Sequence, residues 1–196
     1  MNNKQVEELL FQALETEMGG QQVYKNAVQC ATNPELKEEW KKYLEETKHH
    51  EEVVRGVFSA IGLDPKTETP GRAGVRQHAE TLISMMQSAL KEKPDAAQIV
   101  AAECVVAAEM KDHQNWELLS RVGEALKDKK GQAIRDAVEE VEDQEDEHLY
   151  HTRGWARELW IESLGMPAVI PPPEEEKSVT TMIGAARAEQ SREKML

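Results

Sequence analysis

The stretch Glu145–His148 reads Glu-Asp-Glu-His, and the earlier stretch Glu46–His49 reads Glu-Thr-Lys-His. Both fit the pattern Glu-x-x-His, whose outer two residues lie on the same face of an α-helix because they are three positions apart. Around each stretch, apolar residues recur at alternating steps of three and four, which is typical of a helix with one buried face. We therefore expect two helices, each directing a carboxylate and an imidazole into the same core.

Two more helical segments carry a single glutamate in the middle of an apolar seam. Glu17 follows Leu10 and Leu14, and Glu109 follows Val106. A carboxylate among apolar side chains is costly unless something compensates it, and four at one level would also repel one another. Divalent cations bound by oxygen and imidazole ligands would remove both costs.

The sequence therefore predicts a site for two metal ions, with iron expected and manganese or zinc as alternatives. On the second helix the seam accommodates either His49 or His50, and the Glu-x-x-His spacing selects His49. Tyr24 follows Glu17 by seven residues, and its role is either that of a core aromatic or that of a hydrogen-bond donor to a ligand. The predicted ligands come from four helices: Glu17, Glu46, His49, Glu109, Glu145 and His148.

Eight prolines divide the chain into long segments without proline, and such segments are where long helices can form. Asn33 followed by Pro34 marks one helix start, and Asp95 with Gln98 fits a capping box at another. No strand pattern occurs. Four segments have a helical apolar pattern: residues 4–30, 33–61, 95–123 and 131–164.

The lengths of the links predict the topology. Short links join the first helix to the second and the third to the fourth, which indicates two antiparallel hairpins. The link over residues 63–94 is long, and its part at 75–90 repeats apolar residues at helical spacing. We expect an all-α four-helix bundle over residues 1–166, with an extra helix in a long crossover. Residues 167–196 contain a Pro/Glu-rich spacer and a short amphipathic segment, either a simple tail or a docking peptide for a protein partner.

Composition narrows the classes of partner. The net charge of -13 repels phosphate backbones and anionic lipid, so neither nucleic acid nor a membrane is an expected partner. The first residues lack the apolar core of a signal peptide, and no apolar run is long enough to span a bilayer. Cys30 and Cys104 lie in apolar helical contexts and are interpreted as buried, reduced side chains. These features predict a cytoplasmic protein.

An internal repeat strengthens the metal hypothesis. Leu14-x-x-Glu17-Met18 matches Val106-x-x-Glu109-Met110 at a constant offset, and the two Glu-x-x-His stretches lie at a similar offset. With this ligand pattern, residues 4–164 resemble the ferritin-like superfamily of di-iron carboxylate proteins, and are most similar to the rubrerythrin and bacterioferritin type. The resemblance implies two hairpins, each supplying one glutamate and one Glu-x-x-His motif to a pair of irons.

The chain departs from that family type at three points. It has two cysteines, whereas the rubredoxin domain common in rubrerythrins needs four. Thr47 stands where bacterioferritin has its haem-binding methionine, so no haem is expected. Asp112 stands where rubrerythrins have a second, longer glutamate one turn beyond the ligand of the third helix.

The resemblance implies oxidation of Fe(II) by oxygen or hydrogen peroxide, in a protein that is expected to be a homo-oligomer. Gly19 and Gly20 thin the bundle wall beside Glu17, where a small oxidant or an incoming iron could enter. One alternative is an iron-storage subunit or the cargo of a protein shell. Another is a helical interaction module whose site is vestigial or filled with zinc.

Overall fold

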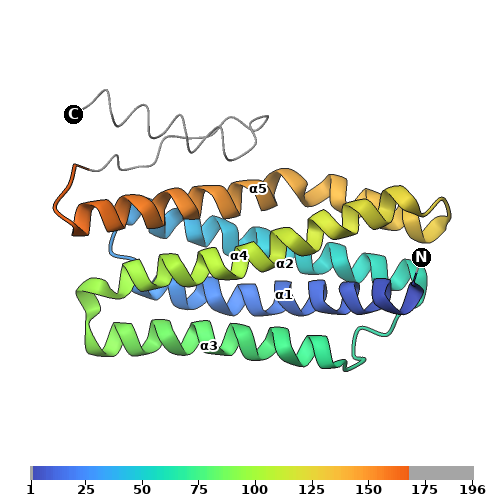
Figure 1. Cartoon of the computed structure of the whole chain (residues 1–196), viewed down its shortest axis with the longest axis horizontal. Coiled ribbons are helices and arrows are strands. Elements are labelled where there is room, and N and C mark those ends of the chain that lie inside the picture. Colours follow the sequence, from blue (N-terminus) through green and yellow to red (C-terminus); the bar gives the residue numbers. More distant parts are fainter. Residues whose placement is uncertain (1, 168–196) are drawn as a thin grey trace.

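A computed structural model describes residues 2–167, and within that range the chain forms helices and no strands (Figure 1). The four predicted helices and the helix of the crossover are all present. The predicted spacer and amphipathic segment beyond Pro167 lie outside the described residues. The five helices are α1 (Asn3–Cys30), α2 (Pro34–Ile61), α3 (Pro70–Glu92), α4 (Pro94–Ala125) and α5 (Lys129–Ser163).

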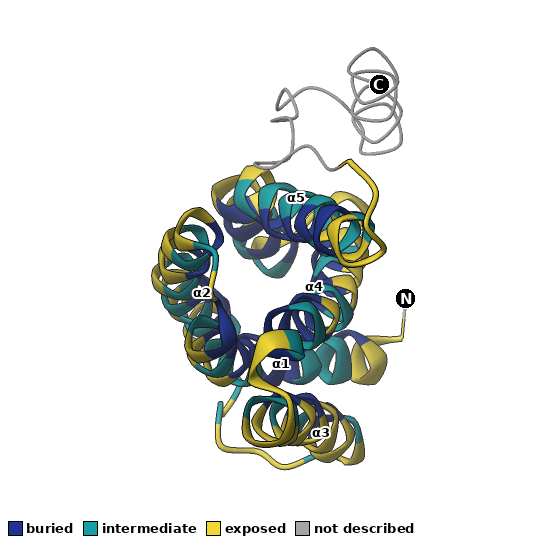
Figure 2. Cartoon of the chain, turned by 90° about the vertical axis from the view of Figure 1, so that its left-hand side faces the viewer, coloured by how far each residue is buried: buried dark blue, intermediate teal, exposed yellow. Residues whose placement is uncertain are grey.

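Helices α1, α2, α4 and α5 form a four-helix bundle, and α3 lies outside it. Figure 2 shows the four around a common centre, with α1 facing α5 and α2 facing α4 across it. Neighbours around the bundle are in contact, whereas α3 contacts only α1 and α4 among the described helices. The link between the two hairpins therefore runs along the bundle as a fifth helix.

Proline and short polar side chains fix where the helices begin. Pro34, Pro70 and Pro94 each occupy a first position, where the missing N–H is not needed. The Asn33 side chain accepts hydrogen bonds from two backbone N–H groups of the first turn of α2. The capping box predicted at Asp95 is wrong, because Lys93 is the N-cap residue of α4 and gives no side-chain cap.

Gln98 joins the two hairpins instead of capping its own helix. Its side-chain oxygen accepts hydrogen bonds from the backbone N–H groups of Thr32 (2.7 Å) and Asn33 (2.5 Å). These N–H groups belong to the link between α1 and α2. The start of α4 is thereby tied to the turn of the first hairpin.

The core consists of two hydrophobic clusters, one toward each end of the bundle. One cluster contains Tyr24, Trp40, Tyr43 and Trp155. The other contains aliphatic and aromatic residues, among them Leu10, Leu14, Phe58, Trp116 and Ile134. Between these clusters, each of the four bundle helices has at least one buried polar side chain: Glu17 on α1, His50 on α2, Glu109 on α4 and Glu145 on α5.

Cys30 and Cys104 are buried and free, as the sequence predicted. Both belong to the cluster that contains Trp40. Among the described residues, no helix is both long enough and apolar enough to cross a membrane.

A buried ion pair holds α3 against α1. The carboxylate of Glu15 is bonded by Arg72 Nε at 2.9 Å and by Arg76 Nε at 2.7 Å. Arg72 is 3% exposed and also donates to the backbone carbonyls of Pro65 and Thr67. Both partners of this carboxylate come from the crossover helix.

The wall beside Glu17 is closed by this packing. A side-chain carbon at Gly19 would lie 2.9 Å from Cβ of Ala79 on α3, and one at Gly20 would lie 3.3 Å from Cγ2 of Thr47 on α2. The two glycines therefore allow neighbouring helices to approach α1 closely. The interpretation that they open a way into the core is wrong.

Candidate metal centre

Three glutamates are buried in the middle layer of the bundle. Glu17 of α1, Glu109 of α4 and Glu145 of α5 are each at most 4% exposed. Glu46 of α2 reaches the same layer from the rim, with its side chain 17% exposed. Each of the four bundle helices thus contributes one carboxylate to the same layer, as the seams predicted.

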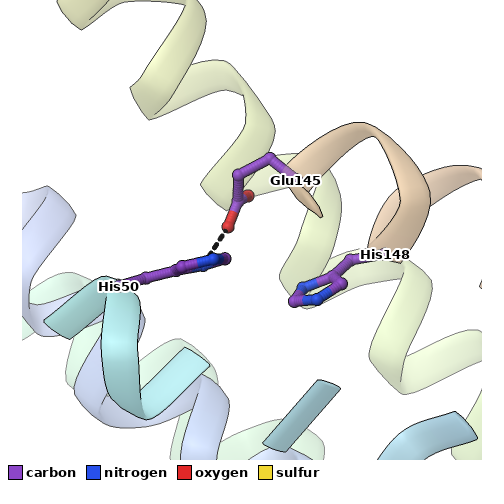
Figure 3. Close-up of side chains that lie close together, drawn as sticks. All are labelled: His50, Glu145 and His148. Atoms are coloured by element: carbon purple, nitrogen blue, oxygen red, sulfur yellow. Dashed lines mark ion pairs between the residues drawn. The ribbon is translucent and has the colours of Figure 1, made fainter. Parts of the chain in front are cut away.

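Two histidines complete the layer. His50 and His148 are almost fully buried, and their rings are stacked with centroids 5.4 Å apart. Nδ1 of His50 lies 2.7 Å from Oε1 of Glu145, and this pair is drawn in Figure 3. Figure 3 also shows His148 beside the pair, on the same helix as Glu145. Both rings therefore project into the carboxylate layer.

The remaining contacts connect all four helices. Nε2 of His148 lies 3.0 Å from Oε2 of Glu46, and its Nδ1 lies 3.7 Å from Oε2 of Glu109. Nδ1 of His50 lies 3.9 Å from Oε2 of Glu17. Because each imidazole lies between carboxylates of two different helices, the two rings bridge the whole layer.

Two groups of ligand atoms are close enough to hold a metal ion. In one, atoms of His50, Glu145 and His148 lie within 4.8 Å of one another, and in the other, atoms of Glu17, Asp112 and Glu145 do so. Glu145 belongs to both groups. A carboxylate with two oxygens can serve two neighbouring ions, so the arrangement suits a pair of sites that share one ligand.

Burial without enough cations shifts the acidities of this layer. Burial and the nearby charge of Glu145 raise the pKa of Glu17 to about 8. Burial, and then the charge of Glu145, also raises the pKa of Glu109 well above its usual value. Burial alone would lower the pKa of His50, but the bond to Glu145 and the charge of Glu17 raise it to about 10. If all the carboxyl groups of the layer were ionised, they would carry more negative charge than its two histidines neutralise, so some of them hold protons instead.

Several buried oxygens in this layer accept no hydrogen bond from the described residues. They are Oε2 of Glu17, Oε2 of Glu109, Oδ1 of Asp112 and Oε2 of Glu145. Buried polar atoms normally have partners, because an unpaired one costs free energy. Cations bound in this layer would supply the missing partners.

The structure does not bring His49 to the layer. Its side chain is 49% exposed, and its Nε2 lies 2.8 Å from Oε1 of Glu140 on the outside of α5. His50 occupies the position that the Glu-x-x-His spacing assigned to His49. Both residues lie near the direction of Glu46 on a helical wheel, at about 40° for His50 and about 60° on the other side for His49. The spacing alone could not choose between them.

Asp112 is a candidate ligand that the sequence analysis treated only as a departure from the family type. It is 4% exposed and lies one turn after Glu109 on α4. Burial, and then the charges of Glu17 and Glu145, raises its pKa well above the usual value. Its position one turn from a seam glutamate was the available signal.

Aromatic residues surround the layer. The indole Nε1–H of Trp116 donates to Oε1 of Glu17 at 2.9 Å. The ring of Tyr24 is fully buried and lies edge-on to His148, with centroids 5.9 Å apart, and its hydroxyl lies near the carboxyl of Glu109. Tyr43 packs on His148 at 4.2 Å and donates its hydroxyl to Glu39. These groups fix the orientation of the ligand side chains and exclude water from one side of the layer.

Comparison with known proteins identifies the family of the chain. Residues 6–151 match the model of a domain of unknown function (DUF892), a family of the ferritin-like superfamily. No curated protein and no solved structure matches the chain. The matched range covers most of the chain and includes every residue of the polar layer described above. The chain therefore belongs to this ferritin-like family, the domain of unknown function DUF892.

Proposed function

We propose that the protein binds two iron ions in the middle layer of its bundle and oxidises Fe(II) with oxygen or hydrogen peroxide as the electron acceptor. The observation that carries this proposal is the set of buried carboxylates from different helices whose oxygens lack hydrogen-bond partners. Family membership supports it at the level of the superfamily.

The residues present suit iron, manganese or zinc better than they suit calcium or magnesium. Mixed carboxylate and imidazole ligands are typical of iron, manganese and zinc, whereas calcium and magnesium prefer oxygen ligands alone. The expected ligands are Glu17, Glu46, Glu109 and Glu145 with His50 and His148, and Asp112 as an additional carboxylate. Iron would supply the electrons of the reaction, one from each ion.

The protein's own groups have two tasks in this reaction. The carboxylates balance the charge that rises on the ions as they are oxidised, which favours the oxidised state. Trp116 holds one of these carboxylates, that of Glu17, in place through its hydrogen bond of 2.9 Å. Glu46, whose side chain is 17% exposed, lies at the rim 3.0 Å from the buried His148, so protons can pass there between the layer and solvent.

The test is to load the metal-free protein with Fe(II) under nitrogen, measure the iron bound, and then mix it rapidly with oxygen or peroxide. We expect two irons per chain and a fast oxidation that the variant Glu145→Ala lacks, because Glu145 is shared by both groups of ligands. Glu139→Ala is the matched control, since Glu139 is an exposed glutamate on the same helix.

Two outcomes would contradict the proposal. Parent-level iron binding and oxidation by Glu145→Ala would show that the layer is not the metal centre. A protein that binds zinc tightly and neither takes up nor oxidises iron would favour a structural metal site in a helical interaction module.

A further inference from the structure

A pocket of about 410 Å³ between α4 and α5 reaches the metal centre from the surface. Its lining includes Glu145, which is shared by both groups of candidate ligands, and Trp116, whose indole holds Glu17. Two larger pockets, along α1, α3 and α4, contain no residue of the centre in their linings. The volume of a pocket therefore does not show which one leads to the metal centre, whereas a lining that includes Glu145 does.

The lining of the α4–α5 pocket is negatively charged. Glu117, Glu124, Glu142 and Asp146 line it in addition to Glu145, and the basic residue in the lining, Arg121, is paired with Glu117 at 2.9 Å. A cleft lined by one sign of charge raises the local concentration of ions of the opposite sign. The pocket would therefore attract cations.

Two side chains of the lining, those of His113 and Asp146, could form an initial binding site for a metal ion. Nδ1 of His113 lies 3.4 Å from Oδ1 of Asp146, and these side chains are 29% and 44% exposed. The ring of His113 also packs against Tyr150 at 5.7 Å. An imidazole and a carboxylate at this separation, open to solvent, can bind a divalent cation loosely.

The inner end of the pocket has a group that can take the ion onward. Glu145 is 2% exposed, and its Oε2 accepts no hydrogen bond from the described residues. A buried carboxylate oxygen without a partner binds a cation more favourably than the exposed pair does, because the ion removes a desolvation cost as well as a charge. The unpaired oxygen of Glu145 would therefore favour transfer of an ion from Asp146, the next residue of α5.

We propose that divalent cations enter the metal centre through the α4–α5 pocket, where His113 and Asp146 bind them before Glu145 does. This inference rests on the proposed function, since it requires a metal centre at Glu145. It adds to that function a separate surface site and a direction of loading.

The test measures how fast the metal-free full-length protein takes up Co(II), whose absorption reports binding without any redox reaction. Ser120→Phe places a bulky group in the pocket lining, and Asp146→Asn removes a charge from its outer site. Each has a matched control. Gln114→Phe adds the same bulk to α4 at a residue that lines only the two other pockets described, and Glu139→Gln removes a charge from an exposed site on α5.

We expect both pocket variants to slow Co(II) uptake by about tenfold, with the final amount of Co(II) bound unchanged and both controls at the parent rate. Parent rates in Ser120→Phe and Asp146→Asn would overturn the entry route while leaving the metal centre intact. A loss of final Co(II) content in Asp146→Asn would also overturn it, because Asp146 would then be part of the centre. A parent protein that binds no Co(II) or Fe(II) would refute the centre itself, and the route with it.

Discussion

Glu15 and Glu17 are two glutamates of the same helix, two residues apart and both buried, yet their surroundings shift their pKa values in opposite directions. Glu15 receives two arginines from α3, which lower the pKa of its carboxyl although burial acts in the other direction. Glu17 receives one indole N–H and a distant imidazole, and burial raises its pKa to about 8.

The difference separates a carboxylate that has fixed counter-charges from one that lacks them. At Glu15 the sequence supplies fixed cations, so the charge is neutralised whenever the chain is folded. At Glu17 the sequence supplies further carboxylates instead. A cation that binds reversibly would have to neutralise their charge. A buried acid without a fixed counter-charge is therefore the mark of a site for a ligand cation.

The largest effect should come from breaking the pair at Glu15. Glu15→Ala leaves Arg72 buried without its carboxylate, so we expect a loss of about 3–5 kcal/mol in the free energy of unfolding, measured by urea denaturation. Glu68→Ala is the control, because Glu68 pairs with the same Arg76 from a side chain that is 64% exposed. Its loss should cost less than about 1 kcal/mol. Equal losses in the two variants would show that burial adds nothing to the pair.

Metal should stabilise the protein through the second kind of carboxylate. At a free metal concentration a hundred times the dissociation constant, we expect about 2.7 kcal/mol of added stability from one site, seen as a higher melting temperature. Glu15→Ala should keep this gain in full, because its pair lies outside the metal centre. A metal response that disappears with Glu15 would mean that the two regions are coupled.

Glu17→Gln should make the metal-free protein more stable at high pH. The folded-state pKa of Glu17 is raised from 4.5 to about 8, so its contribution to the stability of the metal-free protein is lost as pH rises from about 4.5 to 8. The pKa of His50 is raised from 6.5 to about 10, so its contribution is lost as pH rises from about 6.5 to 10. Glutamine keeps an oxygen for Trp116 and has no charge. We expect the metal-free variant to be more stable than the parent by roughly 1–2 kcal/mol at pH 9, and to bind metal more weakly.

Glu15 contributes the opposite pH dependence. Its folded-state pKa is lowered, so its contribution to stability is present above the ordinary value of 4.5 and is lost as pH falls below it. Unfolding curves of metal-free parent and Glu17→Gln between pH 4 and 10 would check both signs. A parent stability that rises steadily toward pH 10 would contradict the assignment of an uncompensated carboxylate to Glu17.

Replacement of His49 is expected to have the smallest effect on stability and on metal content. This side chain is half exposed and outside the layer, so His49→Ala should change stability by no more than about 0.5 kcal/mol and should leave the metal content unchanged. His50→Ala, one residue further on, should lower the metal content. If the two variants behaved the other way round, the side-chain placement on α2 would be wrong.

The sequence predicted the helices and the seam glutamates because both follow from local rules. Prolines mark helix starts, and a period near 3.6 places Glu17 and Glu109 on a buried face without any knowledge of the neighbouring helices. The choice between His49 and His50 could not be made from the sequence, because it depends on the rotation of α2, which its packing against α1 and α5 determines. The pairing of Glu15 with Arg72 was not predicted either. The two residues are 57 positions apart in the sequence, and they meet because the crossover helix packs against α1.

The position of the metal centre along its helices has one more consequence. Glu17, Glu46, Glu109 and Glu145 each lie close to the midpoint of their helix, and Figure 1 shows neighbouring bundle helices running in opposite directions. The partial positive charge at a helix N-terminus, which would favour a carboxylate, acts only within about the first turn. The helix dipoles therefore contribute almost nothing at the centre, and lengthening or trimming the bundle at its ends should leave the affinity for metal unchanged.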